Sequence, residues 1–116
     1  MCIRDRVKLV LAHMGGWRRW EQVPELLADT SALLDTSFSL GSLTPRDEAL
    51  PLDRQMLSDE AFVSLVRAFG AERILFGSDC PWGSPQNDLQ HIRRLPLTDE
   101  GKAAILGGNA KRLLGI

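Results

Sequence analysis

Two side chains that could bind a metal or move a proton each follow a short apolar run in this sequence. His13 comes directly after residues 7–12, and Asp79 follows residues 73–76 and a Gly-Ser pair. Such runs, rich in Val, Leu and Ile, are typical of strands buried on both faces of a parallel sheet. Because ligands gather at the C-terminal ends of parallel strands, His13 and Asp79 are candidates for one site.

The chemistry of this pair is that of a divalent metal site. Histidine nitrogen and aspartate oxygen both bind divalent ions such as zinc. An aspartate can also take a proton from metal-bound water, whose pKa the ion lowers toward about 7, and His13 could act as a general acid or base. The plainer alternatives are that His13 is a hydrogen-bonded structural residue and that Asp79 caps a helix or forms a turn. We expect Cys80 to be a small buried residue.

The elements that must position these residues alternate between strands and helices. Strands are predicted at residues 7–12, 31–37 and 73–76, and helices at residues 17–27, 58–69, 86–95 and 98–106 and in a last short segment ending at 114. This order indicates βα units on a parallel sheet. Asp35 and Thr36 end the middle strand and could face the same mouth as His13 and Asp79. Residues 38–57 form a long irregular stretch, either a functional loop or a surface insertion.

Local signals mark several helix boundaries. Pro24 should kink or restart the first helix, in which Trp17 and Trp20 pack toward the sheet. Ser58 and Thr98 are predicted N-caps. The buried stripe of the helix at 58–69 is predicted to be Phe62, Val63, Val66 and Phe69. We expect the Gly pair at 107–108 to end one helix and Asn109 to cap the last.

Composition restricts the class of protein. The 116 residues fit at most one small domain, and the net charge of −1 gives no support for a nucleic-acid or anionic-membrane partner. No run approaches the roughly 18 apolar residues that span a bilayer. Two cysteines make a disulfide framework unexpected. Without an export signal at the N-terminus, we expect a cytoplasmic protein.

Four motifs resemble a known family. Residues 10–16 (VLAHMGG), 34–37 (LDTS), 74–82 (ILFGSDCPW) and 105–114 (ILGGNAKRLL) are similar, in order and spacing, to the last third of amidohydrolase-related proteins. This branch also contains aminocarboxymuconate-semialdehyde decarboxylase and similar carboxy-lyases. The resemblance implies a (β/α)8 barrel whose strands six, seven and eight are the three predicted here.

The resemblance also implies roles for individual residues. Asp79 matches the strand-eight aspartate, which binds the metal and handles the proton of the attacking water. His13 matches the strand-six histidine, which binds a second metal or acts as an acid or base. The implied cofactor is a divalent metal, with zinc the first choice. Asn109 matches an asparagine of the terminal helix, interpreted as a structural cap.

Other parts of the family pattern have no counterpart in this sequence: the HxH pair of strand one, a strand-four residue and the strand-five histidine. A complete barrel takes about 250 residues. We therefore expect residues 7–116 to be the C-terminal part of an incomplete α/β barrel, and residues 1–6 to be a non-native leader. Alone, such a piece should be inactive and marginally stable, because its edge strands lack partners.

The leading functional hypothesis is a metal-dependent hydrolase, in which metal-activated water attacks a C–N or C–O bond of a small-molecule substrate. A non-oxidative decarboxylase of the same superfamily is one alternative, and a non-catalytic α/β module is another. For the longer parent protein a homodimer is an open option.

Overall fold

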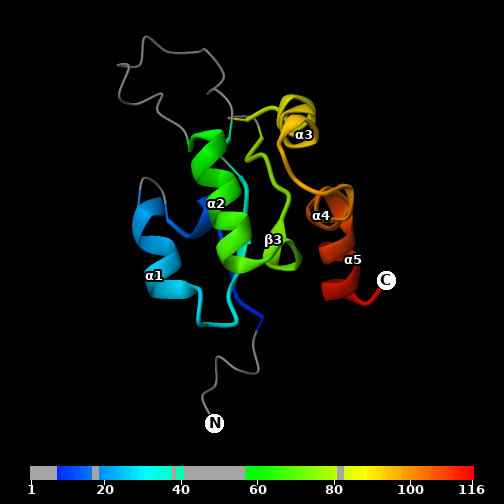
Figure 1. Ribbon diagram of the computed structural model, residues 1–116. Coiled ribbons are helices and arrows are strands. Elements are labelled where there is room, and N and C mark those ends of the chain that lie inside the picture. Colours follow the sequence, from blue (N-terminus) through cyan, green and yellow to red (C-terminus); the bar gives the residue numbers. More distant parts are fainter. Residues whose placement is uncertain (1–7, 17–18, 38, 41–56, 81–82) are drawn as a thin grey trace.

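The computed structural model describes residues 8–16, 19–37, 39–40, 57–80 and 83–116 (Figure 1). Within them, β1 (Val10–Leu11), β2 (Leu33–Asp35) and β3 (Ile74–Leu75) form a parallel sheet in the order β1-β2-β3. The register pairs Val10 with Leu33 and Leu34 with Ile74. The predicted α/β class and the three parallel strands are confirmed, and each paired strand is shorter than its predicted run.

The prediction that the first strand is buried on both faces is wrong for this chain. Leu9 is 46% exposed and Val10 is 38% exposed, whereas Leu34 of β2 is fully buried. The cause is the sheet order, because within the described residues β1 pairs only with β2. The apolar edge of β1 therefore has no covering strand in the described part of the chain.

Helices follow each strand in turn. They are α1 (Val23–Leu27), α2 (Asp59–Phe69), α3 (Pro85–Arg94), α4 (Asp99–Ala103) and α5 (Asn109–Leu114). A 3-10 turn at Trp20–Gln22 leads directly into α1, whose first turn contains Pro24. Proline is tolerated there because the first amides of a helix have no intrahelical acceptor, so the predicted restart is confirmed. Ser58 and Thr98 cap α2 and α4 through their side chains, as predicted.

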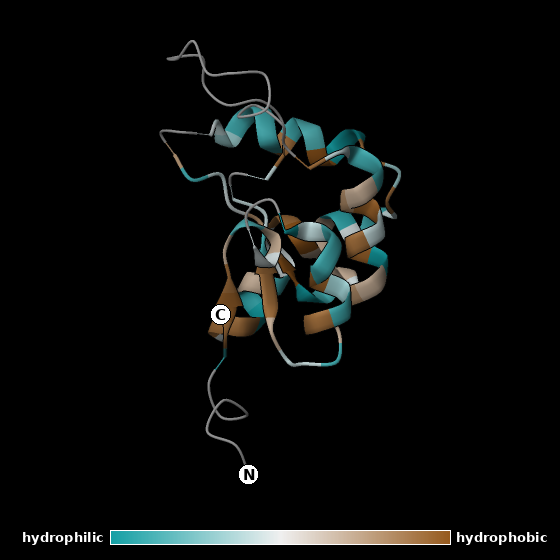
Figure 2. Ribbon diagram, turned by 90° about the vertical axis from the view of Figure 1, so that its left-hand side faces the viewer, coloured by the Kyte–Doolittle hydropathy of each residue, from teal (hydrophilic) through white to brown (hydrophobic). Residues whose placement is uncertain are grey.

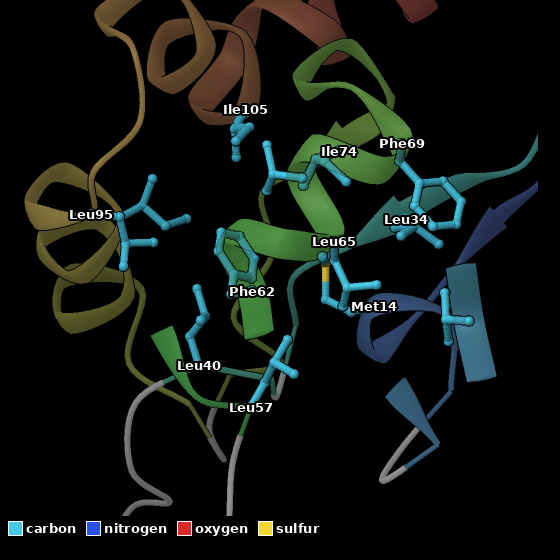
Figure 3. Close-up of a cluster of buried hydrophobic side chains, with 13 residues drawn as sticks. Met14, Leu34, Leu40, Leu57, Phe62, Leu65, Phe69, Ile74, Leu95 and Ile105 are labelled. Atoms are coloured by element: carbon cyan, nitrogen blue, oxygen red, sulfur yellow. The ribbon is translucent and has the colours of Figure 1, made fainter. Parts of the chain in front are cut away.

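The hydrophobic core lies between α2 and the sheet. The predicted stripe of α2 is buried, and Leu65 joins it. Figure 3 shows Phe62 and Leu65 of α2 beside Met14, with Leu40 and Leu57 completing one end of the cluster. By contrast, α3 is mostly hydrophilic along its length (Figure 2). Trp20 is partly buried against this core, which confirms its predicted packing role.

Arg73 joins the start of β3 to the α1–β2 connection. Its guanidinium lies 4.6 Å above the ring of Phe69. It donates to the carbonyl oxygens of Leu27 (3.4 Å), Ala28 (2.8 Å), Thr30 (2.7 Å) and Ala32 (2.7 Å). A planar fork of five donors can satisfy several carbonyls that a helix end leaves unpaired, which a single ammonium cannot do.

The C-terminal helices correct one prediction. The glycine pair does interrupt the helix as predicted, because Gly107 has non-helical backbone angles (φ 174°, ψ −30°) inside the wide turn (Ala104–Gly108) between α4 and α5. Asn109, however, has helical backbone angles and is not an N-cap. Its buried side chain instead donates to the carbonyl oxygens of Ala71 (2.6 Å) and Ile74 (2.7 Å). The predicted structural role of Asn109 thus consists of anchoring the start of β3.

Several predictions fall on residues outside the described ranges: the leader at 1–6, most of the irregular stretch at 38–57, and the environments of Trp17 and Trp82. In the part of the chain that the structure describes, no helix is long and apolar enough to cross a membrane.

Candidate functional site

His13 stands at the C-terminal end of β1, in a 3-10 turn over His13–Gly15. Its imidazole Nδ1 lies 2.9 Å from the carbonyl oxygen of Ser37, which follows β2. A carbonyl oxygen can only accept, so Nδ1 carries the proton and the lone pair of the neutral ring lies on Nε2. The ring is half-buried. His13 is therefore a hydrogen-bonded residue, as the structural alternative predicted. Its tautomer is also the one that metal binding or base catalysis at Nε2 requires.

The main chain of His13 is held as firmly as its ring. The indole Nε1 of Trp20 donates to the His13 carbonyl oxygen at 2.8 Å. Both His13 and Met14 have left-handed backbone angles, which are uncommon for residues other than glycine. Gly15 follows with φ +94°, and a Cβ there would lie 3.0 Å from Cγ1 of Val23. The turn that carries His13 is thus fixed against the start of α1.

The end of β2 joins the two outer strands. The Thr36 hydroxyl donates to the carbonyl oxygen of Gly77 and accepts from its amide, both at 3.0 Å. Thr36 is almost completely buried, and its hydroxyl is engaged with the backbone of Gly77. The Asp35 carboxylate is half-buried and accepts from the amide of Ser37. The residues that follow β2 therefore contact His13 on one side and the strand before Asp79 on the other.

Asp79 is exposed and lies four residues after the end of β3. It has a left-handed backbone (φ +55°), and its carbonyl oxygen accepts from the amide of Gly83 at 3.2 Å. A Cβ at Gly83 would lie only 2.0 Å from the carbonyl oxygen of Ser78, so this turn closes tightly. The helix-cap alternative is wrong, because Ser84 caps α3. Asp79 does form part of a turn, in a conformation that is enriched at functional sites.

The exposure of two residues near Asp79 differs from what the sequence indicated. Cys80 is exposed, which corrects the expectation of a buried residue. Asp88, in the first turns of α3, is 6% exposed, and its carboxylate lies close to Gly83 behind the Asp79 turn. Burial raises the pKa of Asp88, and the nearby His91 partly opposes this. A mostly polar helix gave no sequence signal that this one carboxylate would turn inward.

The two predicted site residues thus lie at the same end of the sheet, with β2 between their strands. Among the described residues, no group of three or more His, Cys, Asp or Glu side chains is placed to hold a metal ion. The sequence did not indicate Ser37, whose contribution is a backbone carbonyl that any residue type could supply.

Comparisons with known proteins extend these observations. No curated protein sequence matches this chain. Among solved structures, it is similar to 2,6-dihydroxybenzoate decarboxylase complexed with 2,6-dihydroxybenzoate, with 17% identity and a TM-score of 0.66 over 96% of this chain and 35% of that one. It is equally similar to a dihydroxybenzoic acid decarboxylase from Polaromonas sp. JS666 with bound manganese and the inhibitor 2-nitroresorcinol. There the identity is 18% and the TM-score 0.66, over 96% of this chain and 34% of that one.

A third similar structure is a proposed 2-pyrone-4,6-dicarboxylic acid hydrolase from Pseudomonas putida. The identity is 21% and the TM-score 0.64, over 94% of this chain and 43% of that one. The chain therefore spans between about a third and less than half of the length of the structures it matches. At these identities the likeness concerns the fold. Residues 5–116 also match the sequence profile of the family described as Amidohydrolase, and this chain accordingly belongs to the amidohydrolase family.

Proposed function

We propose that this chain supplies strands six to eight of a (β/α)8 barrel, and with them two site residues of a metal-dependent enzyme that acts on a small molecule. The observation that carries the proposal is the hydrogen bond from His13 Nδ1 to the Ser37 carbonyl, at the end of the sheet that also bears Asp79. Membership of the amidohydrolase family supports it.

The donor set fits a divalent metal. Histidines that bind metals commonly donate their second ring N–H to a carbonyl or carboxylate, as His13 does to Ser37. The exposed Asp79 carboxylate offers oxygen, and neutral imidazole with carboxylate suits zinc and manganese alike. When bound, such an ion polarises an oxygen of the substrate or of water. His13 and Asp79 would hold the ion or transfer a proton beside it.

Two residues do not complete a catalytic metal site, which usually has three protein ligands and an open position. Within the described residues no third ligand joins them. We propose that the other ligands come from outside these residues. This matches the fraction of related structures that the chain covers, about 35% of the dihydroxybenzoate decarboxylase chain.

We propose non-oxidative decarboxylation of an aromatic carboxylic acid as the reaction, with hydrolysis as the second candidate. Two of the three similar structures described above are dihydroxybenzoate decarboxylases, and one of them holds manganese. The third is a proposed 2-pyrone-4,6-dicarboxylic acid hydrolase, which supports the second candidate. Both reactions would place a carboxylate-bearing substrate beside a cation at the mouth of the barrel.

The experiment uses the longer natural protein that contains this sequence. After the metal is removed, Mn²⁺ or Zn²⁺ is added back, and CO2 release from dihydroxybenzoates is measured beside hydrolysis of a pyrone dicarboxylate. We expect Asp79→Asn to lower metal-dependent turnover by about 100-fold or more while the circular dichroism spectrum is unchanged. Asp29→Asn, an exposed carboxylate in the turn after α1, is the control. Near-normal turnover in Asp79→Asn would contradict the assigned role.

A further inference from the structure

The carboxylate of Asp35 binds Ser37, the residue whose carbonyl oxygen holds the His13 ring, although neither the family motifs nor the proposed mechanism gives Asp35 a role. Asp35 is the last residue of β2, the strand between those of His13 and Asp79. Its Oδ1 accepts from the Ser37 amide. The same oxygen lies against Gly77, where an added Cβ would come within 2.5 Å of it. The carboxylate is therefore held between the turn after β2 and the extension of β3.

Ser37 is hydrogen-bonded to both Asp35 and His13. Its amide is bound by Asp35, and its carbonyl oxygen accepts from His13 Nδ1 at 2.9 Å and from the Ser39 hydroxyl at 3.1 Å. Ser37 and Ser39 are both buried, so water does not compete freely for these groups. A carboxylate acceptor makes a stronger hydrogen bond than a neutral one. Asp35 thus holds the amide of the same residue whose carbonyl oxygen holds the His13 ring.

We propose that Asp35 is a positioning residue for His13, acting through the backbone of Ser37 rather than by touching substrate. This inference rests on the proposed function only for its catalytic meaning. The chain of hydrogen bonds can be tested without any metal or substrate. In the metal-dependent enzyme, loss of such a partner behind a ligating histidine commonly costs 10- to 100-fold in metal affinity or activity.

The first measurement uses the unaltered chain. Scalar couplings across hydrogen bonds should be seen from the Ser37 amide nitrogen to the Asp35 carboxyl carbon, and from His13 Nδ1 to the Ser37 carbonyl carbon. The ¹⁵N shifts of the His13 ring should show the Nδ1–H tautomer as dominant. Absence of either coupling, or dominance of the Nε2–H tautomer, would overturn the proposal.

The second measurement compares variants by the same ¹⁵N shifts. Asp35→Ala removes the acceptor and should change the His13 tautomer ratio by roughly five-fold, the equivalent of one hydrogen bond of about 1 kcal/mol. Asp35→Asn retains an acceptor and should keep the ratio near that of the unaltered chain. Asp29→Ala is the matched control, because that carboxylate is exposed and precedes β2, whereas Asp35 ends this strand.

Gly77→Ala provides an independent variant, since its new methyl group would displace the Asp35 carboxylate from the β3 side. It should shift the His13 tautomer in the same direction as Asp35→Ala. A folded Asp35→Ala with the original tautomer ratio refutes the proposal. If Asp35→Ala does not fold, an unchanged ratio in Gly77→Ala refutes it instead. None of these readouts requires turnover, so the proposed enzyme activity could fail while this inference stands.

Discussion

The anchoring of β3 by Asn109 gives a prediction whose size can be worked from the structure. The side-chain amide is 1% exposed and donates to the carbonyl oxygens of Ala71 and Ile74. Two hydrogen bonds between neutral groups contribute about 1 kcal/mol each. In Asn109→Ala, the loss of a donor to the Ile74 carbonyl and the small cavity add about 1–2 kcal/mol to that loss, while the Ala71 carbonyl keeps the Ile74 amide as a donor.

One contribution has the opposite sign. Asn109 Oδ1 has no hydrogen-bond partner among the described residues, so removing it returns about 1 kcal/mol. The net expectation for Asn109→Ala is a loss of about 2–3 kcal/mol in the free energy of unfolding. Asn109→Asp should lose more at neutral pH, because a carboxylate oxygen would replace the donor and face two carbonyl oxygens.

The assay is urea denaturation of the chain, followed by tryptophan fluorescence and by circular dichroism. Lys111→Ala is the matched control, since Lys111 is exposed on the same helix. We expect this control to change stability by less than about 0.5 kcal/mol. The reasoning fails if Asn109→Ala matches the control, or if Asn109→Asp is as stable as the unaltered chain.

Three further predictions concern single residues. Gly83→Ala should disturb the Asp79 turn, because its methyl group would meet the Ser78 carbonyl oxygen. Gly107→Ala is the control, because a methyl group there meets nothing within 4 Å. The amide chemical shifts of residues 76–80 should therefore change in Gly83→Ala and stay unchanged in Gly107→Ala. Arg73→Lys should lower the free energy of unfolding by about 2 kcal/mol in the same urea assay, since an ammonium cannot bond four carbonyls at once; full stability would contradict this. Burial raises the pKa of Asp88, so the folded state holds its proton more tightly and stability falls as pH rises from the unfolded to the folded pKa. Asp88→Asn should remove this loss of folding stability, so the variant should become more stable than the unaltered chain as pH rises. If the two proteins have the same pH profile of stability, the pKa of Asp88 is not raised by burial.

The sequence predicted elements more reliably than their ends. The α2 stripe repeats with helical spacing and is bounded by Ser58 and Gly70, and those local signals agree with the packing found. The length of β1 could not be predicted, because strand pairing depends on neighbours that the run of residues itself does not specify. The helix break expected at the glycine pair is found at Gly107, where local backbone preference decides. The contacts of Asn109 with Ala71 and Ile74 could not be predicted, because they join segments far apart in the sequence.

In the candidate site, too, the sequence predicted some features and not others. The types and spacing of His13 and Asp79 indicated strand ends, and the sheet brings both to one edge. The contacts that orient His13 involve the carbonyl of Ser37 and the indole of Trp20, which carry no sequence signature of their own. Backbone acceptors are invisible to residue patterns, because every residue has one.

Two contacts that orient His13, and those that orient the strand before Asp79, lie within the described residues. His13 is bound by Ser37 and Trp20, and the strand before Asp79 is bound by Thr36 through Gly77. These contacts are thus built into consecutive βα units, and none of them involves the ligands that would complete the metal site. The tautomer of His13 should therefore be measurable in this chain as it stands. Metal binding and turnover need the rest of the site, so the two tests probe separate steps of the proposal.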